Sequence, residues 1–324
     1  MRDLIILNHR GLHGSLVHEL RQLGMEIVSE NLDPTDVMLD RTLACIFWFY
    51  EGMRSPLQTW RLSRRLRGRG VPLVAWNQDA PHYLNRAAWR LDCYDRARLL
   101  DMYATHTLID KQRCFADTVL YLPNAADVER YGLGGDASAV LKRLRDPGQY
   151  QYDVSFFGAM DGGRYKEMRP RQEFFATLSR RLTDSGIRHV FREAKGMAVA
   201  DQVGLIQSSR INLNFGASCD YGATVASGLP ERCFGIPAAG GFLLCDRRTH
   251  AGDHFVTGTD WADYDGMEDC VSKISYWLRH FDAARDIAEN AYRRVVRDHT
   301  YRHRAATLYR ALSDWHAGMR GSMR

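Results

Sequence analysis

The sequence has no long hydrophobic run. No stretch of its 324 residues approaches the roughly 20 consecutive apolar residues that a membrane-spanning helix requires. The apolar residues 4–7 are followed at once by polar residues, so the beginning of the chain does not resemble a secretory signal peptide. Both absences predict a protein that remains in the cytoplasm.

Cysteine pairs and metal-binding motifs are absent as well. The seven cysteines contain no Cys-x-x-Cys pair, which argues against a disulfide framework and against a zinc site. The twelve histidines include no His-x-His and no His-Glu-x-x-His spacing. We therefore expect reduced thiols in the core, and neither a structural nor a catalytic metal.

The composition is that of an ordinary globular enzyme. Hydrophobic residues make up 45% and charged residues 26% of the chain, which argues against a disordered protein. Because a single hydrophobic core rarely grows beyond about 250–300 residues, the length predicts two domains.

Arginines concentrate in residues 61–69, and the formal net charge of the chain is +5. Such a cluster can contact the phosphates of a nucleic acid or the headgroups of anionic lipids. The alternative is a solvated helix face, because Trp60, Leu62 and Leu66 supply apolar positions within the same stretch. We favour the solvated face.

Apolar strands alternate with helical patterns in the first half of the chain. The apolar runs 4–7, 44–50 and 71–76 are separated by helical patterns at 15–24 and 57–69. This alternation predicts a parallel sheet with helices on both faces.

The second half repeats this organisation. Apolar or alternating strands are predicted at 152–157, 210–215 and 242–245, and a helix is predicted at 170–183. Between the halves, the glycines and prolines of residues 128–152 indicate an inter-domain connection. Two open sheets joined in this way predict a cleft that binds a ligand.

A segment near residue 230 combines charge, glycine and a buried strand. Glu231 and Arg232 precede the small-residue turn 238–241, which leads directly into the apolar strand 242–245. Ligands of open α/β sheets bind at strand ends, where glycines allow the backbone to approach a phosphate. The segment therefore predicts a nucleotide-linked substrate.

Six motifs follow one another in an order that is typical of one family. They are residues 76–82, 122–127, 153–158, 212–215, 231–246 and 298–304. Their order resembles that of GT-B glycosyltransferases of the spore-maturation CgeB-like group, within the glycosyl transferase family 1 group. The resemblance spans nearly the whole chain.

The resemblance implies an α/β protein with the GT-B fold, in which two Rossmann-like domains face a cleft. Residues 1–148 would form the acceptor domain and residues 149–305 the nucleotide-sugar domain. A helix over 306–324 would return to the N-terminal domain. Such enzymes are usually metal-independent and need no cofactor besides the nucleotide sugar, because protein cations and helix dipoles neutralise the departing diphosphate.

One residue departs from the family pattern. Many relatives have a glutamate that binds the nucleotide ribose where this chain has Gly235. Glu231 lies four positions earlier, which is one turn if the segment is helical, and it is the candidate replacement.

Asp79 is the candidate base for the acceptor hydroxyl, with His82 as the alternative. Both residues follow a predicted strand of the acceptor domain, where a carboxylate or an imidazole can accept a proton. The competing interpretation is that Asp79 is a turn residue before Ala-Pro.

Candidate donor contacts come from the second half. The loop 158–163 brings backbone amides to an anion, and nearby Arg164 and Lys166 supply positive charge. The alternative is that this loop only turns the chain. Asn212 and Asn214 share one face of a predicted strand. The full set of candidate donor contacts is Gly158, Arg164, Lys166, Lys195, Asn212, Asn214, Glu231, Arg232 and Gly240.

The sequence thus predicts a metal-independent glycosyltransferase that moves a sugar from a nucleotide-sugar donor to a hydroxyl acceptor. The expected acceptor is a surface glycan, a glycolipid, a glycoprotein or a small metabolite. Two alternatives stay open. One is a transferase acting on a hydroxymethylated DNA base, guided by the arginines of 61–69. The other is a catalytically silent GT-B-like binding module, which Gly235 would favour.

Overall fold

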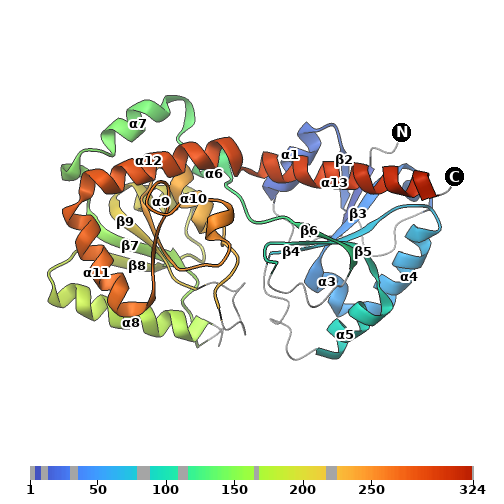
Figure 1. Cartoon of the computed structure of the whole chain (residues 1–324), viewed down its shortest axis with the longest axis horizontal. Coiled ribbons are helices and arrows are strands. Elements are labelled where there is room, and N and C mark those ends of the chain that lie inside the picture. Colours follow the sequence, from blue (N-terminus) through green and yellow to red (C-terminus); the bar gives the residue numbers. More distant parts are fainter. Residues whose placement is uncertain are drawn as a thin grey trace. The chain divides into compact units, whose positions relative to one another are not determined.

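Two compact units make up the chain (Figure 1). The computed structural model describes residues 4–8, 14–29, 36–78, 88–108, 116–163, 168–216 and 225–322. The first unit comprises Met1–Pro123 together with Tyr301–Arg324, and the second comprises Asn124–Thr300. The chain therefore leaves the first unit once and returns to it at its C-terminal end.

The first unit contains a parallel sheet with helices packed around it. In the described residues its strand order is β2-β1-β3-β4-β5-β6, and all neighbouring strands are parallel. The strands are β1 (Leu4–Asn8), β2 (Glu26–Ser29), β3 (Thr42–Trp48), β4 (Leu73–Asn77), β5 (Leu100–Thr105) and β6 (Ala116–Tyr121). The helices are α1 (Gly14–Gln22), α2 (Asp36–Arg41), α3 (Phe49–Arg54), α4 (Pro56–Arg67), α5 (Ala88–Ala97) and α13 (Tyr301–Ser322).

The second unit is built in the same way. Its described strands lie in the order β11-β10-β9-β7-β8, again with parallel neighbours. The strands are β7 (Tyr152–Gly158), β8 (His189–Glu193), β9 (Ser209–Asn214), β10 (Leu243–Asp246) and β11 (Ala262–Tyr264). The helices are α6 (Val128–Tyr131), α7 (Ala137–Arg143), α8 (Arg169–Asp184), α9 (Val199–Gln207), α10 (Arg232–Ala238), α11 (Gly266–Arg279) and α12 (Phe281–Asp298). The predicted α/β architecture with two parallel sheets is confirmed.

The last helix belongs to the first unit, as expected for a helix that returns to the N-terminal domain. α13 packs against α1, and its side chains Leu308 and Leu312 are buried. The Arg304 Nε donates a hydrogen bond to the Pro123 carbonyl oxygen at 2.9 Å. The helix begins at Tyr301, a few residues before the expected start at 306.

The segment predicted to connect the two domains is part of the second unit. α6 packs against α10, and Leu144 is buried. Arg145 forms ion pairs with Glu289 at 2.6 Å and with Asp286 at 2.8 Å. Because these contacts bind the segment to α10 and α12, the observed division follows Pro123, whereas the expected boundary followed residue 148.

Several elements differ from the sequence expectations. The apolar run 44–50 continues as a strand only to Trp48, and α3 follows it, because buried strands and buried helices share the same apolar composition. The sequence around 110–116 predicts a helix, but β6 begins at Ala116, and residues 109–115 lie outside the described residues. The strand expected at 242–245 corresponds to β10, which pairs with both β9 and β11 and is therefore an inner strand of the sheet.

No helix of the described part of the chain combines the length and the apolar character that crossing a membrane requires.

We expect Leu312→Ala to lower the free energy of unfolding of the first unit by about 2–5 kcal/mol, because it leaves a cavity under α13. Arg310→Ala, on the exposed side of the same helix, should change that free energy by less than about 0.5 kcal/mol. Chemical denaturation followed by circular dichroism measures both. If Leu312→Ala destabilised only the unfolding transition of the second unit, the assignment of α13 to the first unit would be wrong.

Candidate functional site

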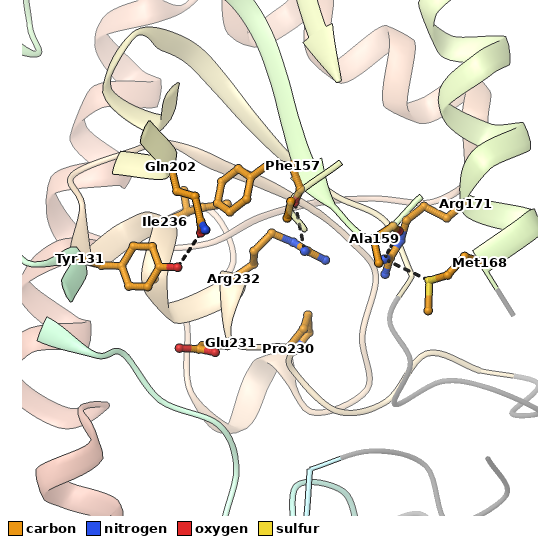
Figure 2. Close-up of a pocket in the computed structure, with 12 residues that line it drawn as sticks. Tyr131, Phe157, Ala159, Met168, Arg171, Gln202, Pro230, Glu231, Arg232 and Ile236 are labelled. Carbon is orange, nitrogen blue, oxygen red and sulfur yellow. Dashed lines mark hydrogen bonds between the residues drawn. The ribbon is translucent and has the colours of Figure 1, made fainter. Parts of the chain in front are cut away.

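A pocket of about 320 Å³ opens in the second unit (Figure 2). It is lined by residues at the end of β7, at the beginning of α8, just after β8 and along α10, with Tyr131 of α6 and Gln202 of α9 on one side. The carboxyl ends of parallel strands meet here, which is where open α/β sheets bind ligands.

Arg232, the first residue of α10, supplies positive charge to the pocket. Its Nε and Nη2 donate to Asn214 Oδ1 at 3.1 and 3.0 Å, and its Nη1 donates to the Phe157 carbonyl oxygen at 3.1 Å. The guanidinium also lies over the Phe156 ring, 4.9 Å from its centroid. Burial lowers the pKa of Arg232, with a smaller contribution from the charge of Arg248, but a guanidinium remains a cation.

Asn214 connects Arg232 to a second charged pair. The Asn214 Nδ2 donates to Asp246 Oδ1 at 2.6 Å. Asp246 Oδ2 also accepts from Arg248 Nη2 at 2.9 Å and from the Gly216 backbone N–H at 3.0 Å. The carboxylate of Asp246 is therefore paired with the buried Arg248, while Arg232 is bound by uncharged acceptors and forms no ion pair with a described carboxylate.

Gly158 allows the Arg232 guanidinium to pass the end of β7. A Cβ at Gly158 would lie 2.7 Å from Arg232 Nη1 and 2.7 Å from the Phe156 ring, which is too close for either contact. The sequence analysis proposed Gly158 as a backbone contact for a phosphate. The structure gives another reason for a glycine here, which is the close approach of the Arg232 side chain.

Glu231 and Gly235 both line the pocket, one helical turn apart. The Gly235 N–H donates to the Glu231 carbonyl oxygen at 2.8 Å, so the segment that contains them is helical. The Tyr131 ring faces Gly235, and the Tyr131 hydroxyl donates to Gln202 Oε1 at 2.6 Å. Burial and then the nearby charge of Glu231 raise the pKa of Tyr131.

Arg171 is a pocket residue that the sequence analysis did not select. From α8 it donates to the carbonyl oxygens of Ala159, Phe215 and Gly216 at 2.9, 2.8 and 2.6 Å. It thereby ties the end of β7 to the residues after β9. The sequence feature that could have indicated Arg171 is its place among the basic residues of 164–171.

Tyr131 and Gln202 were missed as well. Tyr131 lies in the segment that the sequence predicted to be a connection, and Gln202 is an ordinary residue of an amphipathic helix. No pattern in the sequence distinguished either of them.

Gly158 and Asn214 contact Arg232 without being among the residues that line this pocket, and three further described candidate donor contacts do not line it either. The Asn212 side chain is buried, accepts from Ser155 Oγ at 2.9 Å and donates to backbone carbonyls. Gly240 has a φ of +76° after α10, and a Cβ there would lie 2.9 Å from Leu144. Lys195 is exposed beside the lining residue Ala194. Asn212 and Gly240 therefore have packing explanations.

Four candidates cannot be placed. The expected base Asp79, its alternative His82, and the expected phosphate contacts Arg164 and Lys166 lie outside the described residues. In the described ranges, no group of three or more His, Cys, Asp or Glu residues has the arrangement of a metal site.

Several solved structures share the fold of the whole chain. Sucrose-phosphate synthase from Thermosynechococcus elongatus has a TM-score of 0.64 at 11% identity, over 98% of this chain and 100% of that one. HepE from Anabaena, in complex with UDP and glucose, has a TM-score of 0.61 at 12% identity, over 96% and 99%. A trehalose 6-phosphate synthase from Burkholderia multivorans has a TM-score of 0.56 at 11% identity, over 98% and 99%.

No curated protein sequence matches the chain. A family model described as glycosyl transferase-like matches residues 140–310, which is more than half of the chain and includes the whole pocket-forming part of α8, α9 and α10. Together with two parallel α/β sheets and GT-B neighbours that cover both units, this match shows that the chain belongs to the glycosyl transferase-like family and is a glycosyltransferase with the GT-B fold.

Proposed function

We propose that this glycosyltransferase takes its sugar from a uridine-diphosphate sugar bound in the pocket of the second unit. It would transfer the sugar, without a metal ion and in the cytoplasm, to a hydroxyl group of a surface glycan, a glycolipid, a glycoprotein or a small metabolite. The observation that supports this proposal best is Arg232, a pocket-lining cation whose acceptors among the described residues are all uncharged. HepE, which shares the fold, is described in complexes with UDP, with UDP and glucose, and with UDP-glucose.

The proposed place for the diphosphate is beside Arg232. A guanidinium has five N–H donors, and the hydrogen bonds of Arg232 to Asn214 and Phe157 use three of them. The other donors, one each on Nη1 and Nη2, can bind phosphate oxygens. A cation already in position stabilises the negative charge that develops on the leaving diphosphate, which is the task that a metal performs in other transferases.

The proposed place for the nucleoside is the side of the pocket formed by Glu231, Gly235, Tyr131 and Gln202. A carboxylate accepts hydrogen bonds from ribose hydroxyls, and Glu231 is the carboxylate that lines this pocket. It takes over the role that the family resemblance assigns to a glutamate at position 235.

The remaining candidates keep their proposed roles. Arg164 and Lys166 follow the end of β7 closely in the sequence and would add positive charge near the diphosphate, as would the exposed Lys195. Asp79 follows β4 and is the proposed base for the acceptor hydroxyl, with His82 as the alternative.

Titration calorimetry with UDP, GDP, dTDP and CMP tests the donor. We expect UDP to bind most tightly, and we expect Arg232→Gln to weaken UDP binding by about 10–100-fold, the value of a charge-assisted hydrogen bond. Arg247→Gln is the matched control, because Arg247 is exposed and pairs with Asp265. Unchanged UDP affinity in Arg232→Gln would remove the main support for the proposed donor site.

A second experiment compares UDP with its 2′-deoxy form. If Glu231 accepts a hydrogen bond from the ribose, the wild-type protein binds UDP about tenfold or more tightly than 2′-deoxy-UDP. Glu231→Ala, which removes the acceptor oxygens, should reduce that ratio to near one and leave the affinity for inorganic diphosphate unchanged. A ratio that persists in Glu231→Ala would assign ribose recognition to another residue.

The proposed base is tested by turnover. Asp79→Ala should lower kcat by about 10²–10⁴-fold and leave the affinity for UDP unchanged, because a base acts on the acceptor proton and does not hold the donor. Hydrolysis of the preferred UDP-sugar, followed by release of UDP, measures this without knowledge of the acceptor. Wild-type turnover in Asp79→Ala, combined with a loss in His82→Ala, would transfer the role to His82.

A further inference from the structure

The solvent-facing side of α4 combines exposed apolar side chains with arginines. α4 buries Thr59, Leu62, Ser63 and Leu66 toward the core of the first unit. Helical positions three and four residues apart share a face. The opposite side of the helix therefore presents Leu57, Trp60, Arg61 and Arg64, all of which are exposed. We call these four residues the α4 outer face.

The two apolar side chains of the α4 outer face, Leu57 and Trp60, are large and exposed to solvent. Leu57 is 59% exposed and Trp60 is 42% exposed. α5, which packs against α4 in the same unit, adds Trp89 with an exposed fraction of 57%. Leu57 and Trp60 lie three positions apart on one face of α4, which distinguishes them from apolar residues that are scattered singly over a surface.

The charge of α4 has one sign. The helix contains Arg61, Arg64, Arg65 and Arg67 and no acidic residue. Arg67 is paired with Asp101 at 3.2 Å, whereas Arg61 and Arg64 form no ion pair with a described carboxylate. The Arg64 guanidinium lies over the Trp60 ring, 5.3 Å from its centroid. The charges of Arg61 and Arg64 thus lie among the apolar side chains of the α4 outer face, and no described carboxylate neutralises them.

We propose that the α4 outer face binds the surface of a membrane that contains anionic lipids. Helices that lie in a membrane interface place tryptophan and leucine at the boundary between headgroups and acyl chains, and place arginine among the phosphates of the headgroups. Tryptophan suits this boundary because its ring is apolar and its N–H is polar. The phosphates of a nucleic acid would account for the arginines but would leave Leu57 in water.

This proposal does not depend on the proposed function. α4 belongs to the first unit, whereas the pocket lies entirely in the second. A membrane-bound protein that failed to bind UDP would refute only the donor assignment, and a UDP-binding protein that ignored vesicles would refute only the membrane assignment.

The test is co-sedimentation of the full chain with vesicles of phosphatidylcholine, either alone or mixed with phosphatidylglycerol. We expect binding to the mixed vesicles only. Arg61→Gln/Arg64→Gln should weaken that binding roughly fivefold per arginine, because each cation near an anionic surface contributes about that factor. Leu57→Ser/Trp60→Ser should weaken it by about tenfold or more, because two apolar side chains no longer leave water.

Two control variants separate the α4 outer face from general effects. Arg180→Gln/Arg279→Gln removes the same charge from exposed positions of the second unit and should leave vesicle binding unchanged. Val256→Ser, at a residue that is 52% exposed in the second unit, should also have no effect. Equal losses in the control and α4 variants would overturn the proposal.

A nucleic-acid arm completes the experiment. Single-stranded and double-stranded DNA of random sequence are titrated with the same proteins at several salt concentrations. Salt-sensitive DNA binding that Arg61→Gln/Arg64→Gln abolishes, together with no binding to the mixed vesicles, would overturn the membrane assignment in favour of a nucleic acid. Vesicle binding that both α4 variants lose and both controls retain would support it.

Discussion

The pocket depends on one buried amide, the side chain of Asn214. Its oxygen accepts from Arg232 and its nitrogen donates to Asp246, so a neutral group stands between a cation and a carboxylate. The carboxylate is paired with the buried Arg248. If Asp246 instead contacted Arg232 directly, the two charges would cancel within the pocket. The amide therefore holds Arg232 in position and leaves its charge for an anion from outside the protein.

The same arrangement places the pocket on rigid elements. Asn214 ends β9, Asp246 ends β10, and the Phe157 carbonyl that binds Arg232 belongs to β7, so three neighbouring strands fix one guanidinium. Gly158 has no side chain, and this leaves room for the Arg232 guanidinium beside β7. Arg171 donates to backbone carbonyls just after β7 and β9. A cation held by a sheet needs little reorganisation when charge develops on a leaving group, and that is the condition for effective electrostatic catalysis.

Sequence periodicity predicted the two sheets and the strand ends, and therefore located Gly158, Asn214, Glu231 and Arg232 near one another. It could not separate a polar residue that faces a ligand from one that satisfies neighbouring backbone, as Asn212 does. Glycines gave the same ambiguity, because a glycine can allow a ligand to approach or can serve packing alone. Gly240 is explained by its positive φ and by the leucines close to it. Tyr131 could not be predicted, because short helices separated by glycines and prolines resemble a connection until the contacts of α6 with α10 are known.

The glycine at position 235 is explained by the Tyr131 ring beside it, and it does not require that the protein has lost transferase activity. The three atoms nearest to a Cβ at position 235 all belong to the Tyr131 ring, at 3.7–3.9 Å. An alanine would make ordinary contacts there, but the longer side chain of a glutamate would have to displace the ring and its hydrogen bond to Gln202. Tyr131 and a glutamate at 235 are thus alternatives for the same space. Because α10 places Glu231 one turn earlier on the same pocket, our proposal keeps a carboxylate in the pocket at Glu231, while the Tyr131 ring occupies the space beside Gly235.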